Sequence, residues 1–362
     1  MKAAVLYGKE DVRVEEVAPA ALQRGEVRVR IEAALTCGTD LKVFKRGYHA
    51  KMIVPPSVFG HELAGTISEI GTPLTPPPPP SNGERVAARP DEGLIWRVGD
   101  RVVVANSAPC GQCFHCQVGQ KNLCEHLLFL NGAYAESIVV PARLVQKNLL
   151  RLKAETDFRN AALMEPLACV VQGVEDTQLA AGQQVLVIGA GPIGLMFVAL
   201  ARHLGCDMTV AGRQEARLAA AKRLGAGHVI DIDDGHNLVA RIRAATKVHF
   251  DAVIEATGKP EVWEAAVHLV RKGGAVNFFG GCPAGTSITL DTTLIHYSNL
   301  RLLASFHHTP RTIRRALEFI EAGVVHAGDF VGGECPLTRL PELFKQMSQG
   351  NHVVKTLIRV RD

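Results

Sequence analysis

The stretch VLVIGAGPIG, from Val185 to Gly194, decides the fold of this chain. It places G-x-G-x-x-G at Gly189, Gly191 and Gly194, directly after an apolar strand and at the start of a helix, which is the context that makes the motif credible. The first glycine allows a tight turn, the second lets the backbone approach a pyrophosphate, and the third permits close packing of helix on strand. The helix N-terminus then offers N–H groups to phosphate. We therefore expect Gly189, Gly191, Pro192, Ile193 and Gly194 to bind a dinucleotide.

The sequence around this motif alternates between apolar strands and helical stretches. From about Ala154, QVLVIGAG, MTVAGR, HVIDI, FDAVIEATG and AVNFFGG are strand-like, whereas GLMFVALARHLG, EARLAAAKRLGA and EVWEAAVHLVRKG are helical. Such alternation predicts a parallel sheet with helices on both faces, an α/β fold. The first 150 residues instead carry short β-branched runs such as VRVRIEAAL and ELAGTISEIG, which predict a β-rich domain. A chain of 362 residues suits two such cores.

The end of the second strand of this sheet bears on which dinucleotide binds. A site that prefers NAD has Asp or Glu about twenty residues beyond the fingerprint, where it accepts hydrogen bonds from the ribose 2′-hydroxyl. Here MTVAGRQEAR has Gly212 and Arg213 instead, with Arg217 one helical turn further on. The absence of a carboxylate leaves room for a 2′-phosphate, and a guanidinium pairs well with one. We expect the site to prefer NADP. If Arg213 is instead an ordinary solvated arginine, the site would accept NAD as well.

Two later strands end in IEATG (254–258) and FFGG (278–281). Because ligands of an open α/β sheet bind at the carboxyl ends of its strands, we expect Thr257, Phe279 and Gly280 to line the cofactor site. His307 and His308 follow another apolar run, LRLLASF, and the sequence assigns them no role.

Four of the nine cysteines lie close together in PCGQCFHCQVGQKNLC, as Cys110, Cys113, Cys116 and Cys124. Four thiolates can surround a tetrahedral zinc, and a site closed in this way has a structural role. An iron–sulfur cluster and a zinc module that binds nucleic acid are the alternatives. The spacing favours structural zinc, because the short lobe supplies all four ligands.

The composition argues against several classes of partner. The net charge of +4 is small and its basic residues are scattered, which gives nucleic acid or an anionic membrane little to bind. Charged residues occur too early in the N-terminal sequence for a signal peptide, and the apolar run from Val185 to Ala201 is too short to span a membrane. We therefore expect a cytoplasmic protein that binds neither nucleic acid nor membrane.

Together these motifs resemble the medium-chain, zinc-containing alcohol dehydrogenase family. The resemblance rests on the cysteine lobe, the glycine fingerprint and three further motifs, LTCGTD (35–40), FGHELAG (59–65) and MEPLACV (164–170). Glutamate at position 165 places the chain near the sorbitol, threonine and secondary-alcohol dehydrogenase branches. The fold implied is a GroES-like β-rich catalytic domain plus a Rossmann domain with a doubly wound parallel sheet.

The resemblance also implies a domain organisation. The catalytic domain would comprise residues 1–153, with the zinc lobe at about 106–126. The Rossmann domain would comprise residues 154–305, and residues 306–362 would return to the first domain. A proline-rich segment at about 72–96, with five consecutive prolines, interrupts the resemblance, and we expect an exposed insertion between two strands there.

By the same resemblance, a catalytic zinc is held by Cys37 and His61, with Glu62 and Glu165 competing for the third protein position. A catalytic zinc takes three protein ligands and leaves one position open, so a thiolate, an imidazole and one carboxylate suffice. The other glutamate would adjust the metal from just outside the ligand shell. Thr39 matches the family's relay hydroxyl, which takes up the proton of the alcohol. Lys42 stands where many relatives continue the relay with a histidine.

The function implied is hydride transfer between an alcohol and NADP or NAD, with two zinc ions per chain, one catalytic and one structural. Two acidic groups near the metal favour a polar substrate, so we expect a secondary alcohol, sugar alcohol or cyclitol that is oxidised to a ketone. Amino-alcohol oxidation of the threonine dehydrogenase type and a non-catalytic dinucleotide-sensing relative are the alternatives. The family further implies a homodimer or homotetramer.

Overall fold

The computed structural model describes residues 1–49, 52–72, 96–232, 237–350 and 353–361. They form two compact units, one of Met1–Met164, Glu334–Gln349 and Leu357–Asp362, the other of Glu165–Gly333 and Gly350–Thr356. The segment 73–95, which holds most of the expected proline-rich insertion, lies outside the described residues.

The two units divide later in the chain than the sequence analysis expected. The expected limits were 153/154 and 305/306, whereas the structure has Met164 and Gly333. Residues up to Met164 belong to the first unit because α4 (Phe158–Ala161) packs against its strands. Helix α11 (Pro310–Glu321) stays in the second unit, where Arg311 pairs with Glu175 and the Phe319 ring contacts His203.

The first unit is built on antiparallel strands. Its largest sheet has the order β10-β6-β5-β3-β18-β17, with β9 paired to β3; a second sheet has the order β2-β1-β4, and β7 pairs with β8. The strands are β1 (Lys2–Gly8), β2 (Asp11–Glu16), β3 (Val27–Leu35), β4 (Ser57–Val58), β5 (Glu62–Ile70), β6 (Arg101–Val104), β7 (Ser107–Ala108), β8 (Leu128–Phe129), β9 (Ser137–Val140), β10 (Leu149–Arg151), β17 (Val331–Pro336) and β18 (Lys355–Arg359). The first residues of the last two strands, up to Gly333 in β17 and up to Thr356 in β18, belong to the second unit. The helices besides α4 are α1 (Gly38–Arg46), α2 (Phe114–Gln117), α3 (Ala142–Lys147) and α13 (Leu340–Gln349), with short 3-10 turns η1 (Lys121–Leu123) and η2 (Leu337–Arg339). The expected β-rich domain is therefore present.

The pairing of β3 with β5 positions the candidate site of this unit. The first half of β3 has the alternating apolar pattern of a half-buried strand, with Val27, Val29 and Ile31 buried on one face. The antiparallel register sets Leu35, the last residue of β3, opposite Glu62, the first residue of β5. Residues just after β3 and just before β5 must therefore lie at the same end of the sheet.

The second unit is a six-stranded parallel sheet of order β13-β12-β11-β14-β15-β16. This order reverses direction between β11 and β14, which is the switch point where doubly wound sheets bind dinucleotides. The strands are β11 (Gln184–Ile188), β12 (Asp207–Gly212), β13 (His228–Asp231), β14 (Phe250–Glu255), β15 (Val270–Phe278) and β16 (Arg301–Leu303). The helices are α5 (Met164–Thr177, whose first residue belongs to the first unit), α6 (Pro192–His203), α7 (Glu215–Arg223), α8 (Leu238–Ala245), α9 (Pro260–Ala266), α10 (Thr292–Tyr297), α11 and α12 (Ala327–Phe330).

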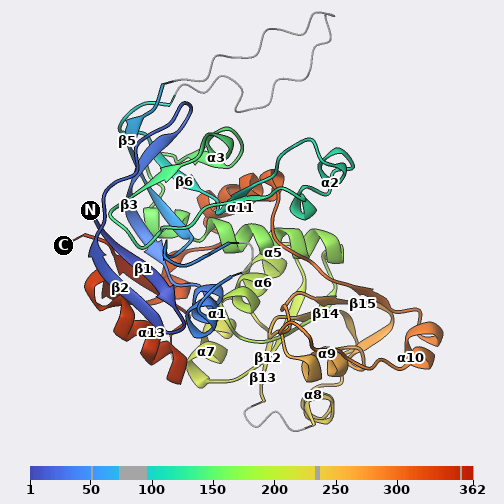
Figure 1. Cartoon of the computed structure of the whole chain (residues 1–362). Coiled ribbons are helices and arrows are strands. Elements are labelled where there is room, and N and C mark those ends of the chain that lie inside the picture. Colours follow the sequence, from blue (N-terminus) through green and yellow to red (C-terminus); the bar gives the residue numbers. More distant parts are fainter. Residues whose placement is uncertain (50–51, 73–95, 233–236, 351–352, 362) are drawn as a thin grey trace, which may run out of the picture. The chain divides into compact units, whose positions relative to one another are not determined.

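Helices α6, α7 and α9 pack against these strands (Figure 1). Residues Val185 to Ile188 of β11 are fully buried, as a parallel strand covered on both faces requires. Helix α9 is shorter than the helical stretch expected at EVWEAAVHLVRKG, because β15 already begins at Val270, which pairs with Phe250 of β14.

Candidate functional site

The first candidate site lies at the shared end of β3 and β5. Cys37 follows β3 by two residues and His61 directly precedes β5, so the register brings them together. The ligand atoms of Cys37, His61 and Glu62 all lie within 4.8 Å of one another. His61 and Glu62 are 3% and 0% exposed, whereas Cys37 is half-buried, so the cluster has one accessible side. The structure thus brings together three of the four residues expected around a catalytic zinc.

Cys37 lies at the N-terminus of α1 (Gly38–Arg46). The residue caps α1, and its Sγ accepts a hydrogen bond from the Thr39 backbone N–H at 3.4 Å. Within α1, Thr39 is half-buried and Lys42 is exposed; their part in a proton relay stays a prediction.

Two residues that the sequence analysis did not single out complete this cluster. His61 Nδ1 lies 2.9 Å from Asp40 Oδ1, and the Tyr134 hydroxyl lies 2.6 Å from the other carboxylate oxygen, Oδ2. All three side chains are buried. Since Asp40 engages Nδ1, Nε2 is left as the metal-binding nitrogen of His61, the arrangement common to zinc-bound histidines. Asp40 follows Cys37 by one helical turn in LTCGTD, a usable signal; Tyr134 is 94 residues away from Asp40 and gave none.

The charges in this cluster act on its titratable groups. Burial lowers the pKa of His61, but the negative charges of Asp40 and Cys37 more than offset this, and the pKa of the imidazole ends well above its ordinary value. Burial and the Asp40 charge raise the pKa of Tyr134 well above its ordinary value, so the phenol keeps its proton. An excess of negative charge around a buried imidazole is what a bound cation would neutralise.

The donor set fits zinc. It offers one thiolate, one imidazole and one carboxylate, which are the S, N and O ligands that zinc uses when it retains an open coordination position. With three protein ligands in the cluster, a tetrahedral zinc would keep one position for water or substrate, unlike a zinc closed by four protein ligands.

Glu165, the fourth residue expected near this zinc, lies at the start of α5 and belongs to the second unit. There its carboxylate and the rings of His307 and His308 have their ligand atoms within 4.8 Å of one another. His308 Nε2 is 3.9 Å from Glu165 Oε1, and both side chains are buried. The sequence had left the two histidines unassigned, because 142 residues separate His307 from Glu165 (307 − 165).

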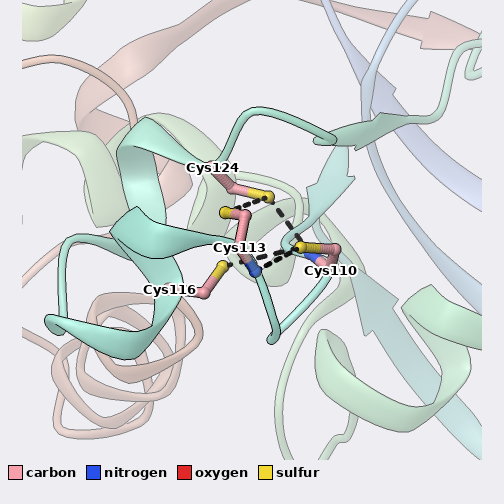
Figure 2. Close-up of side chains that lie close together, drawn as sticks. All are labelled: Cys110, Cys113, Cys116 and Cys124. Carbon is pink, nitrogen blue, oxygen red and sulfur yellow. Dashed lines mark hydrogen bonds between the residues drawn. The ribbon is translucent and has the colours of Figure 1, made fainter.

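The four cysteines of the lobe converge as the spacing predicted (Figure 2). The sulfur atoms of Cys110 and Cys116 are 4.0 Å apart, and those of Cys113 and Cys124 are 3.8 Å apart. Zinc–sulfur bonds of about 2.3 Å in a tetrahedron place the sulfurs about 3.8 Å apart. The four residues therefore fit a tetrahedral zinc with little rearrangement.

Backbone N–H groups prepare this lobe for a metal. Cys110 Sγ accepts hydrogen bonds from the N–H groups of Gln112 and Cys113, which lower the pKa of the Cys110 thiol to about 6. Burial raises the pKa of the Cys116 thiol to about 12. These hydrogen bonds favour loss of the Cys110 proton, whereas a metal must displace the proton of Cys116.

The dinucleotide turn follows β11. Gly189 has φ of +116°, a left-handed conformation that favours glycine, and a Cβ on Gly194 would lie 1.8 Å from the Gly189 carbonyl oxygen. At Gly191 a Cβ would meet nothing within 4 Å, so the chain is open there on the side a pyrophosphate would approach. Helix α6 then starts with Pro192 and Ile193, and no side chain caps its N-terminus. Each glycine has the surroundings that its expected role requires.

The end of β12 has the residues on which cofactor choice was predicted to depend. A Cβ at Gly212 would lie 2.6 Å from Ala190 Cβ, so even a small side chain is excluded. Arg213 is exposed directly after the strand. Arg217 is partly buried on α7, where burial lowers the pKa of its guanidinium and Nη2 lies 3.5 Å from the Val353 carbonyl oxygen. Of the two arginines, Arg213 is the more exposed and is therefore the better placed to contact a ligand.

A buried carboxylate, Glu255, holds the two later turns of this sheet. It accepts hydrogen bonds from the backbone N–H groups of Thr257, at 2.6 Å, and Gly258, while its own backbone carbonyl accepts from Phe279 and Gly280. Burial nevertheless raises the pKa of Glu255. Thr257, Phe279 and Gly280, all expected to line the cofactor site, are thus fixed by one residue that the sequence analysis had overlooked.

Comparison with known proteins agrees with this geometry. Residues 23–149 match the family model of the alcohol dehydrogenase GroES-like domain, and residues 192–322 match that of the zinc-binding dehydrogenases. D-altritol 5-dehydrogenase of Agrobacterium fabrum is 32% identical over 338 residues, which cover 91% of this chain and 90% of the relative. The chain belongs to the medium-chain, zinc-containing alcohol dehydrogenase family. This dehydrogenase therefore has the GroES-like and Rossmann folds that the sequence predicted.

Other relatives place the dehydrogenase among enzymes of alcohols and polyols. Sorbitol dehydrogenase of Bacillus subtilis is 27% identical over 367 residues, covering 99% of this chain and 97% of the relative. A solved zinc-binding dehydrogenase from Sinorhizobium meliloti 1021, bound to NADP, has a TM-score of 0.84 at 28% identity, covering 99% of this chain and 98% of that one. The chain is an alcohol or polyol dehydrogenase of the zinc-dependent class. Among its described residues, no helix has both the length and the apolar character needed to cross a membrane.

Proposed function

We propose that this dehydrogenase oxidises a secondary alcohol, sugar alcohol or cyclitol to a ketone, with NADP as the preferred acceptor and two zinc ions per chain. The observation that carries the proposal is the convergence of Cys37, His61 and Glu62 within 4.8 Å at one end of β3 and β5. A non-catalytic dinucleotide sensor would not need a thiolate, an imidazole and a carboxylate around one point. The names of the polyol dehydrogenases it resembles support the substrate class.

The protein's own residues supply orientation and proton handling. Zinc at Cys37, His61 and a glutamate would act as a Lewis acid that lowers the pKa of the substrate hydroxyl, and the nicotinamide would accept the hydride. The Thr39 hydroxyl, two residues after Cys37, would act as a relay that accepts the released proton while passing its own hydroxyl proton to the next acceptor. The second zinc would be held by Cys110, Cys113, Cys116 and Cys124 and would shape the lobe only. The glycine turn would hold the dinucleotide, with Thr257, Phe279 and Gly280 lining it.

A substrate panel tests the proposed activity. Purified, zinc-loaded protein is mixed with NADP or NAD and with secondary alcohols, sugar alcohols, cyclitols and threonine, and the ultraviolet absorbance of the reduced nicotinamide is followed. We expect reduction with at least one polyol or secondary alcohol and a higher kcat/KM with NADP. Turnover with threonine alone would mean that the substrate is an amino alcohol and not a polyol. A folded protein that binds NADPH but turns over nothing in the panel would contradict the proposed activity.

Arg213 provides the sharpest test of cofactor choice. We expect Arg213→Ala to lower kcat/KM with NADP roughly 10- to 100-fold, because a hydrogen bond to a charged group contributes about 1.5–3 kcal/mol. The kcat/KM with NAD should change little, because NAD lacks the 2′-phosphate that Arg213 would contact. The measurement is kcat/KM with each cofactor. Arg223→Ala, which removes an exposed arginine from the other end of α7, is the matched control. Equal losses with both cofactors would refute a 2′-phosphate contact.

The third protein ligand is proposed to be Glu62, because it groups with Cys37 and His61 while Glu165 groups with His307 and His308. We expect Glu62→Gln to weaken binding of the catalytic zinc by roughly 100-fold or more, since loss of an outer partner alone costs about 10- to 100-fold. Glu165→Gln should keep the zinc and change kcat or KM for the polyol. Zinc content after dialysis against a weak chelator separates the two variants. The opposite result would make Glu165 the ligand.

The remaining expectations are proposals of the same kind. We expect a homodimer or homotetramer, as in the family, and no complex with nucleic acid or membrane. We also expect a cytoplasmic location, because none of the nine cysteines, all of them among the described residues, forms a disulfide, as in a reducing compartment.

A further inference from the structure

Tyr134 lies at the junction of the two segments that present the catalytic ligands. Its hydroxyl is 3.1 Å from the Leu35 carbonyl oxygen, two residues before Cys37. Its backbone N–H donates to the Phe59 carbonyl at 2.9 Å, two residues before His61. One buried residue, 0% exposed, therefore contacts the chain just ahead of both ligands.

The ring of Tyr134 is packed closely by its neighbours. It packs edge-on against Phe59, with ring centroids 5.7 Å apart, and against Phe344 at 6.1 Å. Gly60 lies against the Tyr134 ring, because a Cβ added to Gly60 would lie 2.7 Å from the ring atom Cδ2. The hydroxyl is thus held at a fixed point in a site without water access.

The hydroxyl has one proton and two acceptors within reach. The oxygen of Asp40 lies at 2.6 Å, within the short range of charge-assisted O–H···O bonds, and the Leu35 carbonyl oxygen lies at 3.1 Å. The proton therefore goes to Asp40. Asp40 in turn has one oxygen on Tyr134 and the other on His61 Nδ1 at 2.9 Å, so the tyrosine fixes the rotation of the carboxylate that orients the imidazole.

We propose that Tyr134 is a positioning residue for the catalytic metal, which it serves through Asp40 and His61. Without the tyrosine hydroxyl, one oxygen of the buried Asp40 carboxylate loses its hydrogen-bond donor, so nothing holds the rotation of the carboxylate. Rotation of Asp40 weakens the alignment of His61 Nε2 with Cys37 and Glu62. The inference rests on the proposed function only in assigning the cluster to zinc.

The test is a metal-binding measurement that needs no substrate. The catalytic zinc of wild-type protein, Tyr134→Phe and Asp40→Asn is competed against a graded chelator, and the more weakly held equivalent is followed. Cobalt(II) is then added, and its absorption bands report the geometry at Cys37. We expect Tyr134→Phe to bind the metal about tenfold more weakly with shifted cobalt bands, and Asp40→Asn about 10- to 100-fold more weakly.

Coupling between the two residues separates positioning from general stability. In the Asp40→Asn background, Tyr134→Phe should have less than about a twofold further effect, because its path to His61 is already broken. Tyr7→Phe, which removes an exposed tyrosine–carboxylate bond to Glu15, is the matched control and should leave metal binding unchanged. Unfolding midpoints of the variants verify that each one folds.

The inference is overturned if Tyr134→Phe binds metal as tightly as the wild type, or if its effect persists in full when Asp40 is already replaced. Failure of the proposed activity looks different: the substrate panel would be silent while the metal affinities still followed this order. An active enzyme with unchanged metal affinity in Tyr134→Phe would instead remove the inference and leave the activity in place.

Discussion

We expect Cys37→Ser to lower kcat about 10³-fold and to lose one of two zinc equivalents, because a metal that supplies several kcal/mol of transition-state stabilisation is worth about tenfold per 1.36 kcal/mol. The hydroxyl of serine is a poor zinc ligand, and His61 with one glutamate cannot hold the ion alone. The effect should fall on catalysis and metal content, not on the fold. Zinc content by atomic emission and steady-state rates with the best polyol measure both.

The matched control is Cys206→Ser. That thiol is buried in the second unit and donates to the Ala180 carbonyl at 3.2 Å, a bond that serine preserves. It should keep both zinc ions and near-normal activity. NADPH binding, monitored by fluorescence, should be unchanged in both variants. Cys37→Ser protein that retained two zinc ions and most of its rate would remove this cluster from the mechanism.

The second large effect concerns the cysteine lobe, where Cys116→Ala should unfold residues 110–124 locally. The lobe has only the short α2 and η1, and Phe114, Val118 and Leu123 are exposed, so it has almost no apolar core. Its buried side chains include Cys116 and Cys124 themselves. Structural zinc contributes about 10–16 kcal/mol to the folding of isolated zinc-finger peptides, so here the metal must supply most of the folding energy.

Limited trypsin digestion measures this opening, because Lys121 lies inside the lobe. Wild-type protein should resist cleavage at Lys121, and Cys116→Ala should be cut there rapidly and contain one zinc fewer. Cys335→Ser, at a buried cysteine outside both clusters, should behave as wild type. A Cys116→Ala protein with its full zinc content and the same resistance to trypsin would mean that these cysteines hold no metal.

Much of the fold followed from sequence because its signals are local. The glycine fingerprint, the apolar run of β11 and the cysteine spacing each lie within fifteen neighbouring residues, and the strand, the turn and the cysteine cluster are all present in the structure. The helix expected to run to Gly273 was wrong beyond Ala266, because pairing of Val270 with Phe250 outweighs helical periodicity there. The boundaries between the two units also differ from the expected ones, because no short sequence motif indicates which unit α4 and α11 pack against.

Site residues could be predicted only where a sequence motif or the resemblance to the family indicated them. Cys37, His61 and Glu62 were named from LTCGTD and FGHELAG, and the register of β3 with β5 explains their meeting. Tyr134 could not be found, because a buried hydroxyl that bonds a carboxylate 94 residues away leaves no pattern in the chain. The meeting of Glu165 with His307 and His308 was hidden in the same way.

The most direct test of zinc-dependent alcohol oxidation is the initial rate of NADP reduction by metal-stripped protein as zinc is returned to it. The stripped protein should be folded, should bind NADPH and should have almost no rate with the best polyol. We expect the rate to rise in proportion to occupancy of the more weakly bound equivalent, and not to rise in Cys37→Ser. A full rate in metal-free protein, or recovery of the rate in Cys37→Ser, would contradict the account.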